Sequence, residues 1–209
     1  LHAPDMYMEK LCVGPRGAGA IDITKSLTEN IKNVAAKMNR NVDEITLVML
    51  DRERHHGLMK EARDLGARIM LISDGDVNPA MECCIEGSGV HMVVGTGGAP
   101  EGVLAAAALK CVGGDMQARL KPETEEEIRR CHEMGITDVN QVLTLDDLVR
   151  TDDVIFAATA ITRGNLLNAI QYFPGGARTH TIVMRSKTGT VRFLDTVHMD
   201  EKLKSLKAK

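Results

Sequence analysis

Five charged side chains are placed where they could bind or process a ligand, each shortly after a run of apolar residues: Arg52, Arg54, Asp74, Asp76 and Glu101. Two arginines separated by one residue are suited to binding phosphate oxygens through paired hydrogen bonds. Carboxylates are suited to accepting hydrogen bonds from sugar hydroxyls. These residue types favour a small polar or acidic ligand.

Each of these residues also has a simpler interpretation. The arginines can be ordinary surface cations. Asp74-Gly75-Asp76 can form a turn and a helix cap, because aspartate accepts hydrogen bonds from free backbone N–H groups. Glu101 can merely complement the dipole of a helix.

Three short apolar runs predict three strands, at residues 45–50, 67–73 and 90–95. Helical spacing follows each run, at residues 55–66, 77–86 and 99–114. Strands that alternate with helices predict a parallel sheet with helices on its faces. Ligands of such sheets bind beyond the carboxyl ends of the strands, so we expect the five charged side chains to share one edge.

The loop GTGGAPEG, residues 95–102, follows the third run. It lacks the spacing of a dinucleotide-binding loop, because Pro100 stands where the third glycine is due. Pro100 suits a first helical turn, and Glu101 would then project near a helix terminus that favours an anion. A carboxylate beside a phosphate is tolerated when a cation lies between them, so the loop indicates Mg²⁺ or Mn²⁺.

Neither the histidines nor the cysteines have the spacing of a catalytic or metal site. His55 and His56 are adjacent, without the four-residue spacing that places two ligands on one helix face. Cys83 and Cys84 lie among apolar residues of a predicted helix, which favours core packing. Five cysteines without a CxxC pair indicate reduced thiols and a cytoplasmic location.

Further elements follow from periodicity and turn residues. We expect a helix at residues 27–38, capped by Thr24 or Ser26, and a charged surface helix at 121–135 to which we assign no chemistry. We also expect a strand at 152–161, a short helix at 163–173 and a hairpin at 179–198 with its turn at 187–189. A frayed basic tail follows at 201–209.

The amino-acid composition limits the kinds of binding partner that we expect. The 209 residues are 44% hydrophobic and 26% charged, which suits one compact domain or one and a half. A formal net charge of −3 gives no electrostatic reason to expect nucleic acid or an anionic membrane. We find neither an apolar stretch long enough to span a bilayer nor a signal segment.

Six segments, in order and at matching spacing, closely resemble the GlpX-type class II fructose-1,6-bisphosphatases, including the bifunctional fructose/sedoheptulose bisphosphatases: APDMYMEKL, RERH, DGDV, GGAPEGV, GDMQARL and FAATAITRGNLL. The resemblance runs from Leu1 to the final hairpin. It implies the layered α/β fold of the sugar and inositol phosphatases, with a parallel or mixed sheet flanked by helices. It also implies hydrolysis of the 1-phosphate of fructose 1,6-bisphosphate in gluconeogenesis, with Mn²⁺ or Mg²⁺.

Carried over by motif, the resemblance implies that Glu101 is a catalytic metal ligand. It implies substrate contacts from Tyr7, Arg52, Glu53, Arg54, Asp74, Gly75, Asp76 and Gly98. Arg52 stands where the family often has lysine, and Glu53 lies where it often has proline. Arginine keeps the charge of lysine but not its geometry, which leaves the role of Arg52 less specific.

One motif of the family does not occur in this sequence. Its remaining metal carboxylates, including those of an Asp-Pro-(Ile/Leu)-Glu-Gly-Thr motif, lie upstream of APDMYMEK. We therefore interpret the chain as a carboxyl-terminal part, with residues 1–18 a remnant of an upstream domain and 19–209 an α/β domain ending in a β-hairpin. One glutamate cannot hold a pair of divalent ions, so we expect the isolated chain to have little or no activity.

Three functions stay open at this point. The first is a fructose-1,6-bisphosphatase whose partner is a small sugar bisphosphate, in a protein that we expect to be a homo-oligomer. The second is a bifunctional fructose/sedoheptulose bisphosphatase. The third is a non-catalytic module that binds a phosphosugar or a nucleotide.

Overall fold

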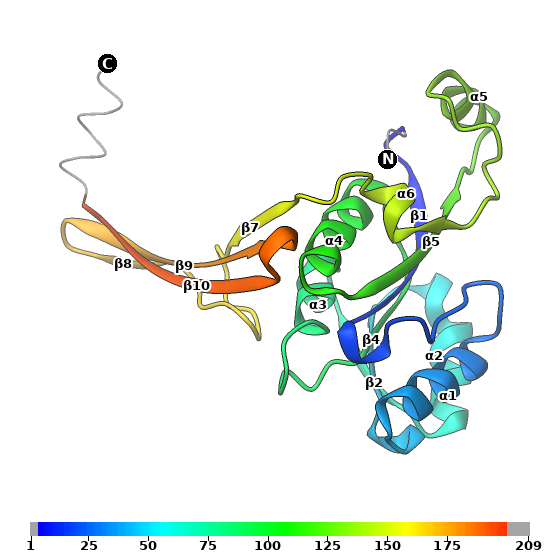
Figure 1. Cartoon of the computed structure of the whole chain (residues 1–209), viewed down its shortest axis with the longest axis horizontal. Coiled ribbons are helices and arrows are strands. Elements are labelled where there is room, and N and C mark those ends of the chain that lie inside the picture. The colour runs from blue at the N-terminus through cyan, green and yellow to red at the C-terminus, as the bar shows by residue number, and fades with distance from the viewer. Residues whose placement is uncertain (1–3, 200–209) are drawn as a thin grey trace.

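The chain folds into a six-stranded mixed sheet with helices on both faces and a second sheet that projects from it (Figure 1). The computed structural model describes residues 4–199. The strands of the large sheet are β1 (Tyr7–Val13), β2 (Thr46–Leu50), β3 (Arg68–Ile72), β4 (Met92–Gly98), β5 (Asp115–Lys121) and β6 (Leu143–Thr144), in the order β3-β2-β4-β1-β5-β6. The helices are α1 (Leu27–Met38), α2 (His56–Leu65), α3 (Val77–Glu82), α4 (Ala99–Val112), α5 (Glu125–Glu133) and α6 (Leu145–Leu148).

The predicted strand and helix units are confirmed, and the sheet is mixed. Strand β2 pairs in parallel with β3 and β4, as alternating strands and helices require. Strand β1 was not expected, and it lies between β4 and β5, antiparallel to both. This insertion brings the amino end of β1 to the edge where β2, β3 and β4 end. The layered α/β fold class is therefore confirmed.

Two hydrophobic cores fill the space on the two faces of the sheet. Helices α1 and α2 cover one face, where Ile31, Val34 and Leu47 are fully buried. Of the two caps predicted for helix α1, Ser26 is the one observed, and it exchanges hydrogen bonds with Glu29. Helices α3, α4 and α6 cover the other face, and the alanine-rich side of α4 lets its backbone approach the sheet closely.

The second sheet comprises β7 (Ile155–Thr159), β8 (Gln171–Phe173), β9 (Gly176–Arg185) and β10 (Thr190–Met199). Strands β9 and β10 form the expected hairpin, with Gly189 in the left-handed region at its turn. The charged helix is also confirmed, as α5. Residues 201–209, predicted as a frayed tail, lie outside the described residues.

The short helix predicted at residues 163–173 is wrong. Residues 163–170 form bends and irregular backbone, and 171–173 form β8, which pairs with β9. Tyr172 lies opposite Ala177 across a turn that contains Gly175 at a φ of 89°. A tight turn followed by a long strand supplies backbone partners that outweigh the weak helical periodicity of this segment.

The cysteines are free thiols, as predicted. Burial raises the pKa of Cys12 to about 12 and that of Cys84 to about 12. A thiol that resists ionisation is a poor nucleophile, so these cysteines act as packing residues.

The boundary predicted near residue 18 stays a prediction. Strand β1 lies before that boundary, yet it pairs along its whole length with β4 and β5. Any division of the complete protein must therefore leave β1 with the large sheet. Within residues 4–199, no helix is both long enough and apolar enough to cross a membrane.

Gly14, just after β1, is expected to tolerate no side chain. A Cβ atom there would lie 1.8 Å from the carbonyl oxygen of Cys83, so either backbone would have to move. We expect Gly14→Ala to lower the free energy of unfolding by about 1–3 kcal/mol. Urea denaturation measures this loss. The control is Gly57→Ala in α2, where the added methyl meets nothing within 4 Å and should leave stability unchanged or slightly higher. Equal stability of the two variants would contradict the prediction.

Candidate functional site

Four strand ends meet at one edge of the large sheet. The carboxyl ends of β2, β3 and β4 lie there because these strands are parallel. The amino end of β1 joins them because β1 is antiparallel to β4, with Tyr7 directly opposite Gly98. The candidate site is therefore built from segments that are far apart in the sequence.

Arg54 lies beside Tyr7 at the end of β4. Its guanidinium carbon is 4.9 Å from the centre of the Tyr7 ring, within range of a cation–π contact. Arg54 Nε and Nη2 donate hydrogen bonds of 3.1 and 2.8 Å to the carbonyl oxygen of Thr96. These contacts fix an exposed positive charge above the glycine loop.

Arg52 points to a different strand. Its Nη1 and Nη2 donate to the carbonyl oxygens of Asp51 and Ser73, each at 2.8 Å, so it lies at the end of β3 next to Asp74. Asp74 accepts a hydrogen bond from the backbone N–H of Gly75. The helix cap of the simpler interpretation is wrong, because the Asp76 side chain makes no capping hydrogen bond to α3 and binds Lys10 instead. Glu53 is exposed in the short helical turn between the two arginines.

A buried ion pair lies beneath this edge. Lys10 Nζ of β1 is 2.6 Å from Asp76 Oδ2, and their side chains are only 4% and 14% exposed. Gly97 leaves room for the pair, because a Cβ atom there would lie 2.4 Å from the same Asp76 oxygen. Lys10 was not among the predicted site residues. Its position directly before the buried run Leu11–Val13 was a signal that its charge needs an acidic partner.

Glu101 lies in the first turn of α4, as the position of Pro100 predicts. A Cβ atom on Gly98 would lie 2.0 Å from Glu101 Oε2, so the carboxylate folds back over that glycine. The two residues are therefore in direct contact. The simpler role of Glu101 as a complement to the helix dipole stays compatible with this position.

Gly95 and His55 connect β2 to β4. His55 is buried, and its Nε2 accepts a hydrogen bond from Thr96 N–H while its Nδ1 donates to the carbonyl oxygen of Leu50, both at 2.8 Å. Gly95 has a φ of 136°, and a Cβ atom there would lie 2.8 Å from the imidazole ring. His55 is therefore a structural residue, which agrees with leaving it out of the site.

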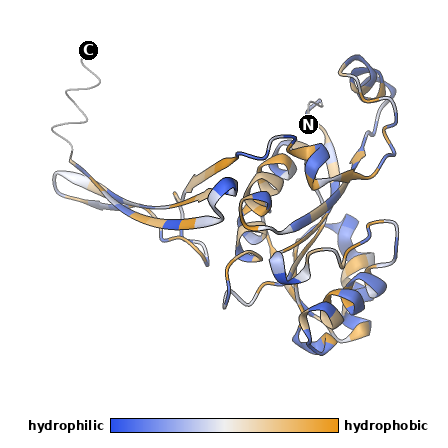
Figure 2. Cartoon of the chain, viewed as in Figure 1, coloured by the Kyte–Doolittle hydropathy of each residue, from blue (hydrophilic) through white to orange (hydrophobic). Residues whose placement is uncertain are grey.

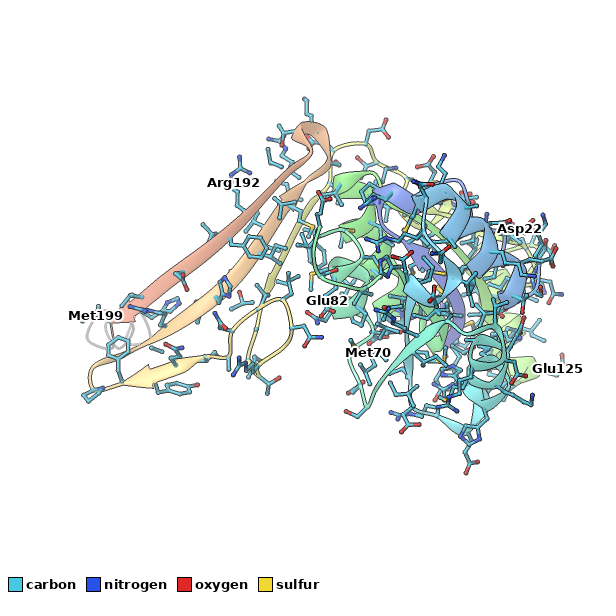
Figure 3. The ribbon with its side chains drawn as sticks, turned by 90° about the horizontal axis from the view of Figure 1, so that it is seen from below. Asp22, Met70, Glu82, Glu125, Arg192 and Met199 are labelled. Atoms are coloured by element: carbon cyan, nitrogen blue, oxygen red, sulfur yellow. The ribbon has the colours of Figure 1, made fainter. Side chains whose placement is uncertain are left out.

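A cavity of about 650 Å³ adjoins the edge, between α3 and the segment that follows β7. Its lining includes Asp74, Gly75, Asn78, Glu82 and Asn165. Glu82 is buried and accepts hydrogen bonds from the amides of Asn78 and Asn165, and burial raises the pKa of its carboxyl group. Figure 3 shows Glu82 and Met70 on the side of the body that faces this segment.

The described residues do not form a complete metal site. Among residues 4–199, no group of three or more His, Cys, Asp or Glu side chains is arranged to hold a metal ion. Asp76 is already paired with Lys10, which leaves Glu101 as a single candidate ligand. This part of the chain therefore does not fit a pair of divalent ions by itself.

The site and the fold together define a layered α/β protein of the sugar-phosphatase type. The family described as bacterial fructose-1,6-bisphosphatase, glpX-encoded, matches residues 1–198, and the chain belongs to this family.

Curated relatives agree with the family. The chain is 44% identical to a D-fructose 1,6-bisphosphatase class 2/sedoheptulose 1,7-bisphosphatase of Crocosphaera subtropica, over 99% of this chain and 64% of the relative. It is 44% identical to the protein of the same name from Synechococcus elongatus, over 98% of this chain and 63% of that relative. The chain thus spans slightly less than two thirds of these proteins.

The structure brings together most of the predicted site residues. Tyr7, Arg54, Gly98 and Glu101 surround the end of β4, and Asp76 lies just beneath them beside Gly97. The remaining predicted contacts, Arg52, Glu53, Asp74 and Gly75, lie at the ends of β2 and β3. Their individual roles toward a substrate stay predictions.

Breaking the buried ion pair should be costly. Lys10→Met leaves the Asp76 carboxylate buried without its cation, and we expect a loss of about 3 kcal/mol in the free energy of unfolding. Lys60→Met is the matched control, since it breaks an exposed pair with Asp64 and should cost less than about 1 kcal/mol. The two losses are compared by urea denaturation at pH 7, and similar values would contradict a structural role for the pair.

Glu82 predicts a dependence of stability on pH. A raised pKa means that the folded protein holds the Glu82 proton more tightly than the unfolded chain does. Its contribution to stability is therefore fully present below the unfolded pKa near 4.5 and is lost as the pH rises through the folded value. Relative to Glu82→Gln, the unmodified chain should lose stability as the pH rises above about 4.5. If the free energies of unfolding of the unmodified chain and of Glu82→Gln change with pH in the same way, the effect is excluded.

Proposed function

We propose that this chain forms the substrate-binding part of a class II fructose-1,6-bisphosphatase, which hydrolyses fructose 1,6-bisphosphate to fructose 6-phosphate and phosphate in gluconeogenesis. The observation that carries the proposal is the meeting of Tyr7, Arg54, Gly98 and Glu101 at one sheet edge, in a chain that matches this family over residues 1–198.

The arginines supply the phosphate-binding groups. Arg54 is exposed and anchored to Thr96, so its charge is available at the end of β4. The amino end of α4 adds backbone N–H groups and a positive dipole end at the same place. Arg52 lies one strand away and is suited to a second phosphate of the same sugar.

The aspartates supply acceptors for the sugar hydroxyls. Lys10 holds Oδ2 of Asp76, so Oδ1 is the oxygen that we assign to a hydroxyl. Asp74 is exposed beside Gly75, where the backbone has no side chain to obstruct a ligand. The Tyr7 ring forms an apolar wall held by the cation of Arg54.

Class II fructose-1,6-bisphosphatases are metal-dependent phosphatases. We assign Glu101 as one ligand of a Mn²⁺ or Mg²⁺ ion, since hard cations take carboxylate and phosphate oxygens together. The other ligands must come from outside the described residues. The free cysteines support a reducing compartment, and we propose the cytoplasm.

Sedoheptulose 1,7-bisphosphate is a second candidate substrate. The relatives from Crocosphaera subtropica and Synechococcus elongatus carry both activities in their names. Both sugars end in phosphates and differ in length, so the spacing between Arg54 and Arg52 is the feature that would distinguish them.

Phosphate release from the complete gene product tests the function. We expect release from fructose 1,6-bisphosphate in the presence of Mn²⁺, with sedoheptulose 1,7-bisphosphate as the second substrate and inositol phosphate as the negative control. Glu101→Gln should lower kcat at least about 100-fold, corresponding to about 2.7 kcal/mol, with a smaller change in KM. The control Glu86→Gln changes an exposed glutamate beyond α3 and should leave kcat intact.

Two results would refute this proposal. Unchanged kcat of Glu101→Gln at saturating Mn²⁺ would remove Glu101 from the site. Calorimetric binding of fructose 1,6-bisphosphate without any phosphate release would instead favour a non-catalytic phosphosugar-binding module.

A further inference from the structure

A second cavity lies at the opposite edge of the large sheet from the candidate site. Its volume is about 430 Å³, and its lining includes Thr46 and Arg68, the first residues of β2 and β3. The candidate site lies where these two parallel strands end. Strand β2 has five residues, which separates the two edges by about 15 Å. The second cavity is therefore a separate place for a ligand.

Three arginines line this cavity together: Arg16 just after β1, Arg40 just after α1 and Arg68 at the start of β3. Figure 2 shows hydrophilic residues along much of α1 and α2, so polar side chains are common on this side of the body. What sets the three arginines apart is that they come from distant parts of the sequence and meet around one hollow. We call Arg16, Arg40 and Arg68 the arginine cluster.

The arginine cluster keeps hydrogen-bond donors available for a ligand. Arg16 Nη1 lies 3.7 Å from Glu86 Oε1, and Arg40 Nη1 lies 3.9 Å from Glu44 Oε1. Both distances exceed the range of a hydrogen bond, so neither glutamate holds its arginine closely. Within residues 4–199, the Arg68 side chain has no ion pair. Three arginines against two glutamates leave the cavity with an excess of positive charge.

His91 lies in the electrostatic field of the cluster and also lines the cavity. Burial lowers the pKa of His91, and the charges of Arg40, Arg16 and Arg68 lower it further. The imidazole is therefore neutral at pH 7, and its Nδ1 accepts a hydrogen bond of 3.0 Å from the backbone N–H of Thr46. The proton of this neutral ring then lies on Nε2, which adds a donor to the cavity.

A turn with two glycines, Gly87 and Gly89, also lines the cavity. Both glycines have a positive φ, of 82° and 79°, and a Cβ atom on either would meet nothing within 4 Å. In the part of the chain that the structure describes, their backbone N–H groups make no hydrogen bond. Exposed backbone N–H groups of such turns are suited to binding an anion.

We propose that this cavity binds a small phosphate monoester. The three terminal oxygens of a phosphate group offer one acceptor to each guanidinium group of the cluster, whereas a carboxylate has only two oxygens. A phosphate monoester carries a charge of about −2 at pH 7, which the excess of positive charge attracts.

The size and the remaining lining of the cavity favour an ester over a bare ion. A volume of about 430 Å³ is in the range of sites for small organic molecules. Met38 and Ile85 add apolar lining for the organic part. Among the described residues, none of the predicted substrate contacts lines this cavity, so the proposal does not depend on the function proposed above.

Methionine-methyl NMR of the complete gene product locates the binding. Met38 lines this cavity and Met70 lines the cavity beside Asp74, so the two methyl signals distinguish the two edges of the sheet. The probe is ribose 5-phosphate, added at constant ionic strength with sodium chloride as the balancing salt. We expect the Met38 signal to shift and to saturate. A Met38 signal that stays in place throughout the titration would overturn the proposal.

The variant Arg40→Gln/Arg68→Gln removes two members of the cluster. It should raise the dissociation constant read from the Met38 signal at least about tenfold, because charge-assisted hydrogen bonds to the phosphate are lost. The matched control, Arg63→Gln/Arg192→Gln, removes two exposed arginines outside the cavity and changes the net charge equally. It should leave the dissociation constant within about threefold, since salt screens distant charges. Equal weakening by both variants would assign the binding to overall charge and refute the site.

Inorganic phosphate tests the class of ligand. We expect it to bind more weakly than ribose 5-phosphate, because it has no organic part to contact Met38 and Ile85. Equal affinity would assign the cavity to the bare phosphate ion and overturn the assignment to a monoester. Phosphate release from fructose 1,6-bisphosphate is measured separately, so its absence would refute the proposed function and leave this site standing.

Discussion

The ion pair between Lys10 and Asp76 connects the strand at the centre of the sheet to the segment that follows β3. Lys10 can be buried in β1 only because a carboxylate compensates its charge, and Asp76 is held at the sheet edge by the same contact. Neutral side chains at both positions would allow the core to pack, but they would remove the acceptor that faces the candidate site. A requirement of the core and a requirement of the site are thus met by one interaction.

The glycines of the loop at residues 95–102 are explained by their neighbours. Gly95 leaves room for the His55 ring, Gly97 for Asp76, and Gly98 for the carboxylate of Glu101. The loop is therefore also a place where polar side chains from two other segments, and Glu101 of the loop itself, approach the backbone closely.

The two sheets differ in how far other elements cover their faces. The large sheet has helices on both faces, whereas the second sheet has exposed apolar side chains on both of its faces among the described residues. At the candidate site, the described residues include no group of three or more side chains that could hold a metal ion, and the assignment of Glu101 as a ligand stays a prediction.

The sequence by itself determined the elements whose signals are local. Apolar periodicity located α1, α2, α4 and the strands β2, β3 and β4, and the motifs identified the family. Tertiary structure decided the position of β1, the partner of Lys10 and the strand at residues 171–173. These features depend on contacts between distant segments, such as residues 10 and 76, and the local pattern of one segment does not specify its partner. The side chains of Tyr7 and Arg54 were predicted separately, and only the antiparallel pairing of β1 with β4 brings them together.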